Sequence, residues 1–295
     1  MTTPLFNTLS LIGLGLIGSS IARKAKQQGL AGQVIGYDQD DETRIIARDL
    51  KLVDHVTDRL SQASKADLVI LCTPLSSYFS VVATLAPELK PGTILSDVGS
   101  VKNQLGIEDL LPEGIVFIPA HPLAGTEHSG PHAGFAELFE NRWCLITAQE
   151  SPQRDQVAAF WRRLGSTVAF ESSSHHDRVM AITSHLPHLI AFAIVGTADQ
   201  LEDDVREEII RYAASGFRSF TRIAGSDPTM WRDVFLRNKA PLLEIIDRFI
   251  QDLTRLHTAI DEQDGDFLYD LILRTRKIRR DVIRDDPTGT PYDGI

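Results

Sequence analysis

The chain has 295 residues, of which 43% are hydrophobic and 24% charged, so it is long enough for two domains and has an ordinary globular composition. Its formal net charge of −10 argues against general binding to nucleic acids or anionic membranes, although a local basic pocket could still take an anionic substrate. The first residues lack the basic region of a targeting sequence, and the longest uncharged apolar run, around the first glycines, is too short to span a bilayer. We therefore expect a cytoplasmic protein that binds neither nucleic acid nor membrane.

The two cysteines, Cys72 and Cys144, each lie in an apolar, strand-like run. This placement predicts buried free thiols in a reducing compartment. No spacing of His, Cys, Asp or Glu in the sequence is typical of a metal site, so we expect no metal.

Residues 9–38 have the pattern of a βαβ unit that binds a dinucleotide. An apolar strand over residues 9–12 is followed by a glycine-rich turn, a helix over residues 17–28 and a second strand over residues 33–37. The turn has the spacing GxGxxG, formed by Gly13, Gly15 and Gly18. Because this motif stands between a strand and a helix, it predicts a site for NAD or NADP.

Each position of this turn has a physical task. Gly13 permits the tight turn, Gly15 lets the backbone approach a pyrophosphate, and Gly18 lets the helix pack closely on the strand. The amides of the first helical turn, at Leu16 and Ile17, then face the phosphates. These five residues are candidate contacts of the cofactor.

Asp38 closes the second strand and indicates which dinucleotide is bound. A carboxylate at this position accepts hydrogen bonds from the ribose 2′-hydroxyl and repels a 2′-phosphate. We therefore expect NAD as the cofactor. Arg44, on the next predicted helix, is interpreted as a solvated helix charge rather than as a phosphate ligand.

Strands and helices go on alternating as a parallel, doubly wound sheet requires. Further strands are predicted at residues 66–73, 93–98, 115–119, 143–147 and 167–171, and a helix at residues 155–164. Ligands of such sheets bind at the carboxyl ends of the strands, so the loops with Thr73 and Pro74 and with Ser100 are expected to line the cofactor cleft. We assign residues 1–172 to an α/β, Rossmann-type NAD-binding domain.

Residues 173–295 show helical patterns throughout and are assigned to a second, all-α domain. A long helix presents an apolar seam with alternating spacings of four and three, made of Leu242, Ile246, Phe249, Leu253, Leu256 and Ile260. A second helix is predicted over residues 267–284, with a basic run near its carboxyl end, where cations are favoured. The seam needs a partner, which is either another helix of the same chain or a helix of a second copy.

Three clusters outside the glycine turn are more specific. They are SVK at residues 100–102, HPLAGTEHSG at residues 121–130, and SHLPH at residues 184–188 together with GFRSFTRIAGSDPTMWRD at residues 216–233. With these motifs the chain closely resembles the prephenate and arogenate (cyclohexadienyl) dehydrogenases of tyrosine biosynthesis, from about Leu9 to at least Asn238. The resemblance implies a helical dimerisation domain like the carboxyl-terminal domain of 6-phosphogluconate dehydrogenase, a homodimer, and oxidative decarboxylation of a cyclohexadienol.

The chemistry implied by this resemblance needs a base. As hydride leaves the carbinol carbon for NAD, the hydroxyl proton must be accepted, and an imidazole whose pKa is near neutrality suits that task. His121 follows a predicted strand near the expected cofactor site, and the family's His-Pro motif indicates the same residue. Ser100 occupies the family position beside this histidine, where its hydroxyl could orient imidazole and substrate.

Candidate substrate ligands come from the third cluster. Arg222 matches a family arginine that binds a substrate carboxylate, and a planar guanidinium suits bidentate binding. Arg218, four residues earlier, would add positive potential on the same face of a helix. His185 and His188 flank Pro187, and the resemblance places them at the substrate pocket.

The remaining pocket candidates are Thr126 and Glu127, which follow the expected catalytic loop, and Trp231, which would supply an apolar wall. Four other histidines have no role that the sequence supports and are expected to face solvent: His128, His132, His175 and His176.

Two other functions stay open on the sequence. A β-hydroxyacid-type dehydrogenase would need a catalytic lysine after glycines in the helical domain, and Lys239 lacks those glycines. A non-catalytic dinucleotide sensor would not need His121, Ser100 and Arg222 together. The choice between prephenate and arogenate is also open, because an acidic residue such as Glu127 or Glu140 could pair with the arogenate ammonium group.

Overall fold

The computed structural model describes residues 3–103, 105–201 and 215–284. By its internal contacts the chain divides into two compact units, Met1–Asn238 and Lys239–Ile295. The first unit contains both sheets and every candidate site residue, and the second contains two long helices.

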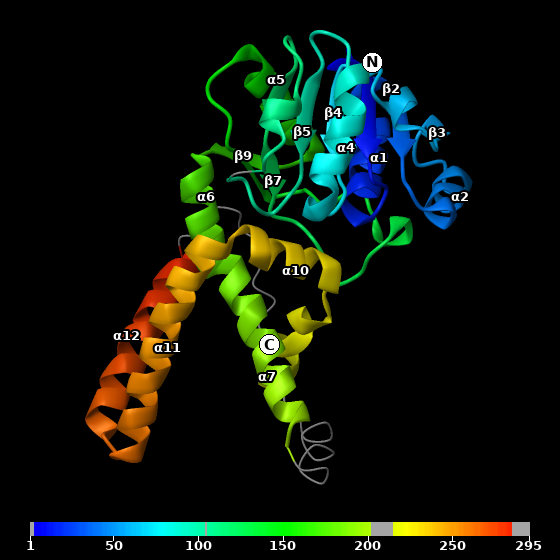
Figure 1. Ribbon diagram of the computed structural model, residues 1–295. Coiled ribbons are helices and arrows are strands. Elements are labelled where there is room, and N and C mark those ends of the chain that lie inside the picture. The colour runs from blue at the N-terminus through cyan, green and yellow to red at the C-terminus, as the bar shows by residue number, and fades with distance from the viewer. Residues whose placement is uncertain (1–2, 104, 202–214, 285–295) are drawn as a thin grey trace. The chain divides into compact units, whose positions relative to one another are not determined.

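A parallel sheet of six strands forms the centre of the first unit (Figure 1). Its strands are β1 (Phe6–Ile12), β2 (Ala31–Tyr37), β3 (His55–Thr57), β4 (Leu68–Leu71), β5 (Ile94–Asp97) and β6 (Val116–Ile118). They lie in the order β3-β2-β1-β4-β5-β6, with every neighbouring pair parallel. This is the strand order of a dinucleotide-binding Rossmann fold, and it confirms the predicted fold class.

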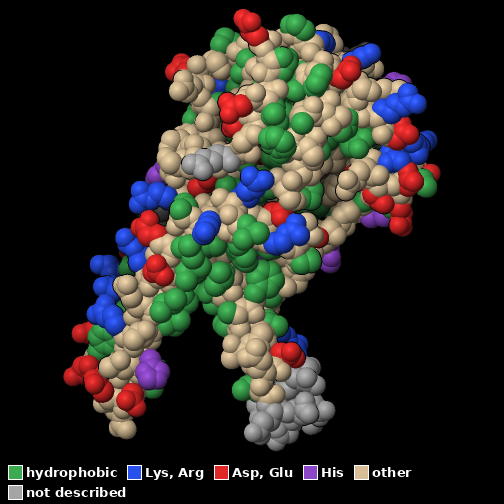
Figure 2. Space-filling view, in the orientation of Figure 1, with side chains coloured by type: hydrophobic (Ala, Val, Ile, Leu, Met, Phe, Trp, Pro, Cys, Tyr) green, Lys and Arg blue, Asp and Glu red, His purple; other side chains and the backbone are tan. Residues whose placement is uncertain are grey.

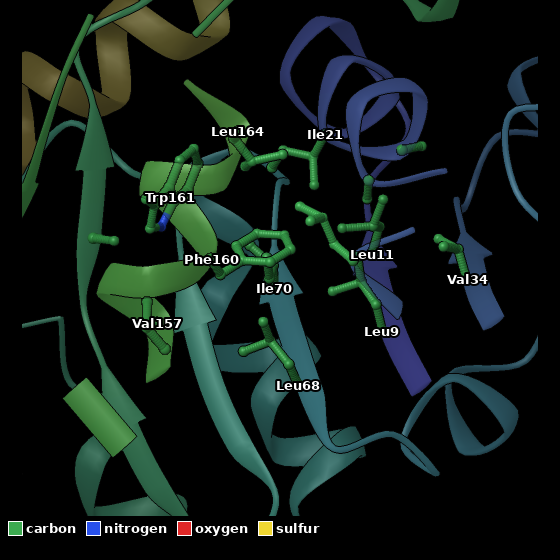
Figure 3. Packing of buried hydrophobic residues seen from close by; sticks show 14 of the residues in the cluster. Leu9, Leu11, Ile21, Val34, Leu68, Ile70, Val157, Phe160, Trp161 and Leu164 are labelled. Carbon is green, nitrogen blue, oxygen red and sulfur yellow. The ribbon is translucent and has the colours of Figure 1, made fainter. Parts of the chain in front are cut away.

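Helices cover both faces of this sheet. They are α1 (Leu16–Gln28), α2 (Asp41–Asp49), α3 (Leu60–Ala63), α4 (Tyr78–Leu85) and α5 (Pro152–Leu164). Side chains alternate along each strand, so Leu68 and Ile70 of β4 join one apolar cluster, with α1 and α5, while Val69 and Leu71 join the other, with α4. Figure 3 shows the first cluster, in which Phe160 and Trp161 of α5 lie beside the strand residues.

A second, three-stranded sheet follows, made of β7 (Ala120–Pro122), β8 (Trp143–Ile146) and β9 (Thr167–Phe170). β7 is antiparallel to β8, and β8 is parallel to β9. The sequence predicted the last two strands but neither β7 nor their separation from the large sheet. Three residues that include a proline are too few for a periodic pattern, so His121, expected on a loop, lies in a strand opposite Leu145.

After β9, the described part of the first unit is helical. α6 (Ser173–Met180) continues through a π-helical turn (Ala181–His185) into α7 (Leu186–Asp199), and α9 (Ser215–Thr221), a 3₁₀ turn (Arg222–Gly225) and α10 (Pro228–Arg237) follow. The run Ser173–Asp199 has a mean hydropathy of 1.6 in its most apolar window and is long enough to cross a membrane by length and composition. The expectation that no segment is long enough is therefore wrong for this helix.

The second unit is a pair of helices, α11 (Lys239–Asp261) and α12 (Gly265–Arg284), as predicted. The Asp264 carboxylate accepts a hydrogen bond from the Phe267 amide at 3.0 Å and so caps the first turn of α12. Within this chain the predicted seam of α11 is only partly covered, since Leu242 is buried but Leu253 and Ile260 are exposed.

Truncation of the core tests this description of the sheet. Phe160 is fully buried and makes edge-on ring contacts with Phe6 and Trp161 at 6.1 Å each. We expect Phe160→Ala to lower the free energy of unfolding by about 3–5 kcal/mol, because a cavity replaces the ring. Urea unfolding measures this loss. Phe79→Ala is the control, since Phe79 is 55% exposed on α4 and should cost much less; equal losses would contradict the packing.

Candidate active site

The glycine turn has the geometry that a pyrophosphate site needs. Gly13 has φ +102°, and a Cβ there would lie 2.7 Å from the Cys72 carbonyl oxygen. A Cβ on Gly18 would lie 2.0 Å from the Gly13 carbonyl oxygen, so neither position accepts a side chain. A Cβ on Gly15 would meet nothing within 4 Å. The space beside Gly15 is therefore open to a ligand, as the motif predicts.

The amino terminus of α1 faces the same turn. Gly15 is the residue before the helix and has no side chain to cap it, and the first helical turn contains no acidic residue. The amides of the first turn, including those of Leu16 and Ile17, therefore have no intrahelical partner and favour an anion. These features fit the phosphates of a dinucleotide.

Asp38 is held at the end of β2, beside the turn. Its Oδ2 accepts a hydrogen bond from the Leu14 amide at 2.8 Å, and its Oδ1 accepts one from the Asp40 amide at 3.0 Å. Arg44 was expected to be solvated, which is wrong. Its side chain is only 11% exposed, donates to the Asp38 carbonyl oxygen at 2.7 Å and pairs with Asp41.

The loop after β4 connects the sheet to the helices that follow it. Thr73 accepts a hydrogen bond from the Ser77 hydroxyl at 2.8 Å, and Pro74 precedes a short 3₁₀ turn. The Ser76 amide donates to Asp233 of α10 at 2.9 Å. The expected cofactor loop is thus fixed to the helix that carries Trp231.

His121 is buried and belongs to a hydrogen-bonded chain that the sequence analysis did not anticipate. Its Nδ1 lies 2.9 Å from Nε2 of His176, and Nδ1 of His176 lies 2.8 Å from Oδ1 of Asp177. His176, expected in solvent, is 1% exposed, whereas His128, His132 and His175 are exposed as predicted. The chain His121–His176–Asp177 therefore runs from β7 into α6.

Asp177 also anchors the loop that carries Ser100. The amides of Lys102 and Asn103 each donate to its carboxylate at 2.8 Å. Ser100 itself is half-buried in this loop. The loop with Ser100 and the strand with His121 are therefore both bound to α6.

A second buried carboxylate, Asp97, holds the other side of this loop. It accepts hydrogen bonds from the Lys102 ammonium group and from the Gly99 amide, the latter at 2.9 Å, while its other oxygen accepts one from the Ala120 amide at 3.2 Å. Burial lowers the pKa of Lys102, which the neighbouring Asp97 counteracts. Asp97 thereby joins the end of β5 to β7, next to His121.

His185 is the next member of the network. The side-chain amide of Asn238 contacts Nδ1 of His185 at 2.9 Å and donates to the Asp177 backbone carbonyl at 2.8 Å. Nε2 of His185 is buried and has no partner among the described residues.

Trp231 joins His185 and His188 into one aromatic group. The His188 ring stacks on Trp231 with centroids 3.6 Å apart, and the His185 ring meets it edge-on at 6.1 Å. Nδ1 of His188 donates to the Ser184 carbonyl oxygen at 2.9 Å. The indole N–H of Trp231 is buried without a partner among the described residues. The three predicted pocket residues therefore lie together.

The charged candidates lie at the surface. Arg222 donates to Glu127 at 3.1 Å, with side chains 58% and 35% exposed. Thr126 accepts a hydrogen bond from the His128 amide, and Arg218 is exposed on α9. Arg222 also lowers the pKa of His188, although burial has the larger effect. The structure thus brings Arg222 and Glu127 together and places Arg222 near the aromatic group.

Burial favours the neutral forms of His121 and His185. It lowers the pKa of His121 well below 6.5, with smaller contributions from His176 and Lys102, and it lowers the pKa of His185 to about 4. A neutral imidazole can accept a proton at neutral pH, so His121 has the protonation state that a general base requires.

Helical spacing could have indicated Asp177, one of the network residues that the sequence analysis missed. Asp177, Ala181 and His185 are four residues apart and buried, so they share one face of the helix. His176 lies next to this face. Asn238 shows no comparable signal, since its partners Asp177 and His185 are distant in the sequence.

Comparisons with known proteins identify the family of the chain. Residues 21–170 match the family model for the nucleotide-binding domain of prephenate dehydrogenase, and residues 172–274 match the model for its dimerisation domain. The cyclohexadienyl dehydrogenase of Zymomonas mobilis is 43% identical, over 93% of this chain and 95% of that protein. The prephenate dehydrogenase of Bacillus subtilis is 33% identical, over 93% of this chain and 76% of that protein.

Solved structures show the same relationship. The prephenate dehydrogenase of Aquifex aeolicus, solved with hydroxyphenyl propionate and NAD⁺, has a TM-score of 0.87 and 30% identity, and the match covers 96% of this chain and 99% of that one. Synechocystis arogenate dehydrogenase has a TM-score of 0.77 and 29% identity, covering 93% of this chain and 99% of that one. The glycine turn, the buried His121 and these matches together show that the chain belongs to the prephenate dehydrogenase family.

Proposed function

We propose that this chain catalyses the NAD-dependent oxidative decarboxylation of prephenate, L-arogenate or both, with His121 as the general base. The observation that carries the proposal is the burial of His121 in β7, which favours the neutral imidazole, next to the loop that carries Ser100. The carboxyl ends of β1, β4 and β5 lie at one edge of the parallel sheet, so the glycine turn, Thr73 with Pro74, and Ser100 share that edge.

The reaction sets the tasks of these residues. NAD supplies the acceptor for the hydride that leaves the carbinol carbon. His121 accepts the hydroxyl proton as the C–O bond becomes a carbonyl, and the Ser100 hydroxyl orients both groups. The bond from the ring to its carboxylate then breaks, carbon dioxide leaves, and the bonding electrons make the ring aromatic. The phenolate oxygen takes the proton back from His121, so no net proton leaves the site.

The anionic substrate is bound by the exposed arginines, Arg218 and Arg222, and by the aromatic group around Trp231. Arg222 has five N–H donors and can hold a carboxylate while Glu127 keeps its own contact. Arg218 adds positive potential nearby. His185 and His188 offer ring nitrogens to polar groups of the substrate, Trp231 supplies a flat apolar wall, and Thr126 shapes the rim.

Residues 1–172 bind NAD, and the helical region, residues 173–295, forms the interface of a homodimer. Residues 172–274 match a dimerisation domain. Figure 2 shows hydrophobic side chains gathered along the π-helical turn and α7, where Ile182, Ile194 and Val195 are exposed. A second copy of the chain would cover these side chains and would explain why a protein that we expect in the cytoplasm has a helix apolar enough for a membrane.

The test is NADH or NADPH formation with prephenate and L-arogenate, each with NAD and with NADP. Turnover of either substrate with NAD, and little with NADP, is the result that the site and Asp38 predict. If protein that is shown to bind NAD gives no turnover with any of the four pairs of substrate and cofactor, the proposal is contradicted. That result would favour a dinucleotide sensor or a β-hydroxyacid-type enzyme.

Removal of the His121 imidazole tests its role as the base. We expect His121→Asn to lower kcat roughly 10²–10⁴-fold, because no imidazole accepts the hydroxyl proton, while the affinity for NAD stays close to that of the wild type. Steady-state kinetics and NAD titration measure the two effects. Near-normal turnover would remove His121 from the mechanism.

Loss of the carboxylate ligand should act on substrate binding. We expect Arg222→Gln to raise KM at least about 30-fold, equivalent to about 2 kcal/mol, since the substrate carboxylate that covers this guanidinium on binding loses its charged hydrogen-bond partner. Arg248→Gln is the matched control, because Arg248 is also an exposed arginine paired with a glutamate, Glu244, on α11. An unchanged KM for Arg222→Gln would move the anion site elsewhere, with Arg218 as the next candidate.

A further inference from the structure

We propose that His176 and Asp177 are positioning residues that hold His121 in one tautomer, with its proton on Nδ1 and with Nε2 as the bare nitrogen that meets the substrate. The proposal deepens the proposed function, since it rests on His121 being the base. His176 contacts His121 directly, and Asp177 is linked to His121 through His176.

The direction of the chain is set at Asp177. Both oxygens of its carboxylate accept backbone amides, from Lys102 and from Asn103. A carboxylate bound in this way is an acceptor, so the 2.8 Å contact with His176 requires the proton to be on Nδ1 of His176.

The next contact follows from the first. A neutral imidazole with its proton on Nδ1 has a bare Nε2, so His176 can only accept at that atom. The 2.9 Å contact then requires Nδ1 of His121 to be the donor. With that proton on Nδ1, Nε2 of neutral His121 is bare and can accept the substrate proton. The same logic, a carboxylate that fixes a catalytic imidazole, holds in serine protease triads.

Asp177 sets the opposite tautomer in His185. Asn238 donates one N–H to the Asp177 carbonyl oxygen, which fixes the orientation of its side-chain amide. The other N–H then donates to Nδ1 of His185, so the His185 proton lies on Nε2, the atom without a partner. Asp177 thus leaves a hydrogen-bond acceptor at Nε2 of His121 and a donor at Nε2 of His185. A substrate hydroxyl can donate to the first, and a substrate carboxylate can accept from the second.

Substitution of His176 separates positioning from packing. The amide oxygen of His176→Gln can replace Nε2 as the acceptor for His121, and its N–H can donate to Asp177. His176→Leu keeps an apolar volume but removes both contacts. We expect kcat to fall roughly 10- to 100-fold in His176→Leu, less than the loss of the base itself would cost, because His121 remains, with the affinity for NAD unchanged. In His176→Gln we expect kcat to stay within a few-fold of the wild type.

His175→Leu is the matched control, because His175 is the exposed neighbour on the same helix. It should leave kcat and KM unchanged. Wild-type kcat in His176→Leu would overturn the proposal, as would equal losses in the Leu and Gln variants. Failure of the wild type to turn over prephenate or arogenate would instead contradict the proposed function, and the tautomers would then be decided by spectroscopy alone.

The ¹⁵N shifts of the ring nitrogens report the tautomer directly and need no turnover. We would label histidine with ¹⁵N in the full-length protein saturated with NAD, and assign the His121 and His185 signals by their loss in His121→Asn and His185→Asn. The proposal predicts a protonated Nδ1 and a bare Nε2 for His121, and the reverse for His185. A protonated Nε2 on His121 would overturn it, even if His176→Leu fails to fold.

Discussion

The site depends on one buried carboxylate, Asp177, and on the four hydrogen bonds that its residue makes, three of them with other elements. Its two oxygens bind the loop after β5 and the His176 ring, and its backbone carbonyl binds Asn238. A charge is stable in such a place only when its hydrogen-bonding capacity is filled. Asp177 therefore fixes three elements around His121. They are the loop after β5, the helix that starts at Ser173 and the end of α10.

The burial of this network suits the balance of protons in the reaction. The proton that His121 accepts from the substrate hydroxyl returns to the phenolate oxygen, so the base needs no path to bulk water. Removal of water from the site also strengthens each hydrogen bond in it and keeps the imidazole neutral. The surface pair Arg222 and Glu127, by contrast, stays accessible to an anion that arrives from solvent.

Much of the fold and part of the site could be predicted from the sequence. The glycine turn, its flanking strand and helix, and Asp38 follow from local rules of backbone sterics and helix dipoles, and the structure contains them. The second sheet, the enclosed Arg44 and the buried His176 could not be predicted in this way. The second sheet and the buried His176 depend on contacts between residues far apart in the chain, such as His121 with His176, for which neither periodicity nor spacing gives a signal.

The pH dependence of kcat tests the central claim, that a buried neutral His121 is the base. Burial lowers its pKa below 6.5, and the neutral form is the active one, so kcat should stay constant from pH 8 to pH 6.5. It should fall only as the pH drops further and the imidazole gains a proton, and this acid limb should be absent from the residual rate of His121→Asn. Initial rates, each with an enzyme-free blank, measure the profile. An acid limb at or above pH 7 would contradict the account.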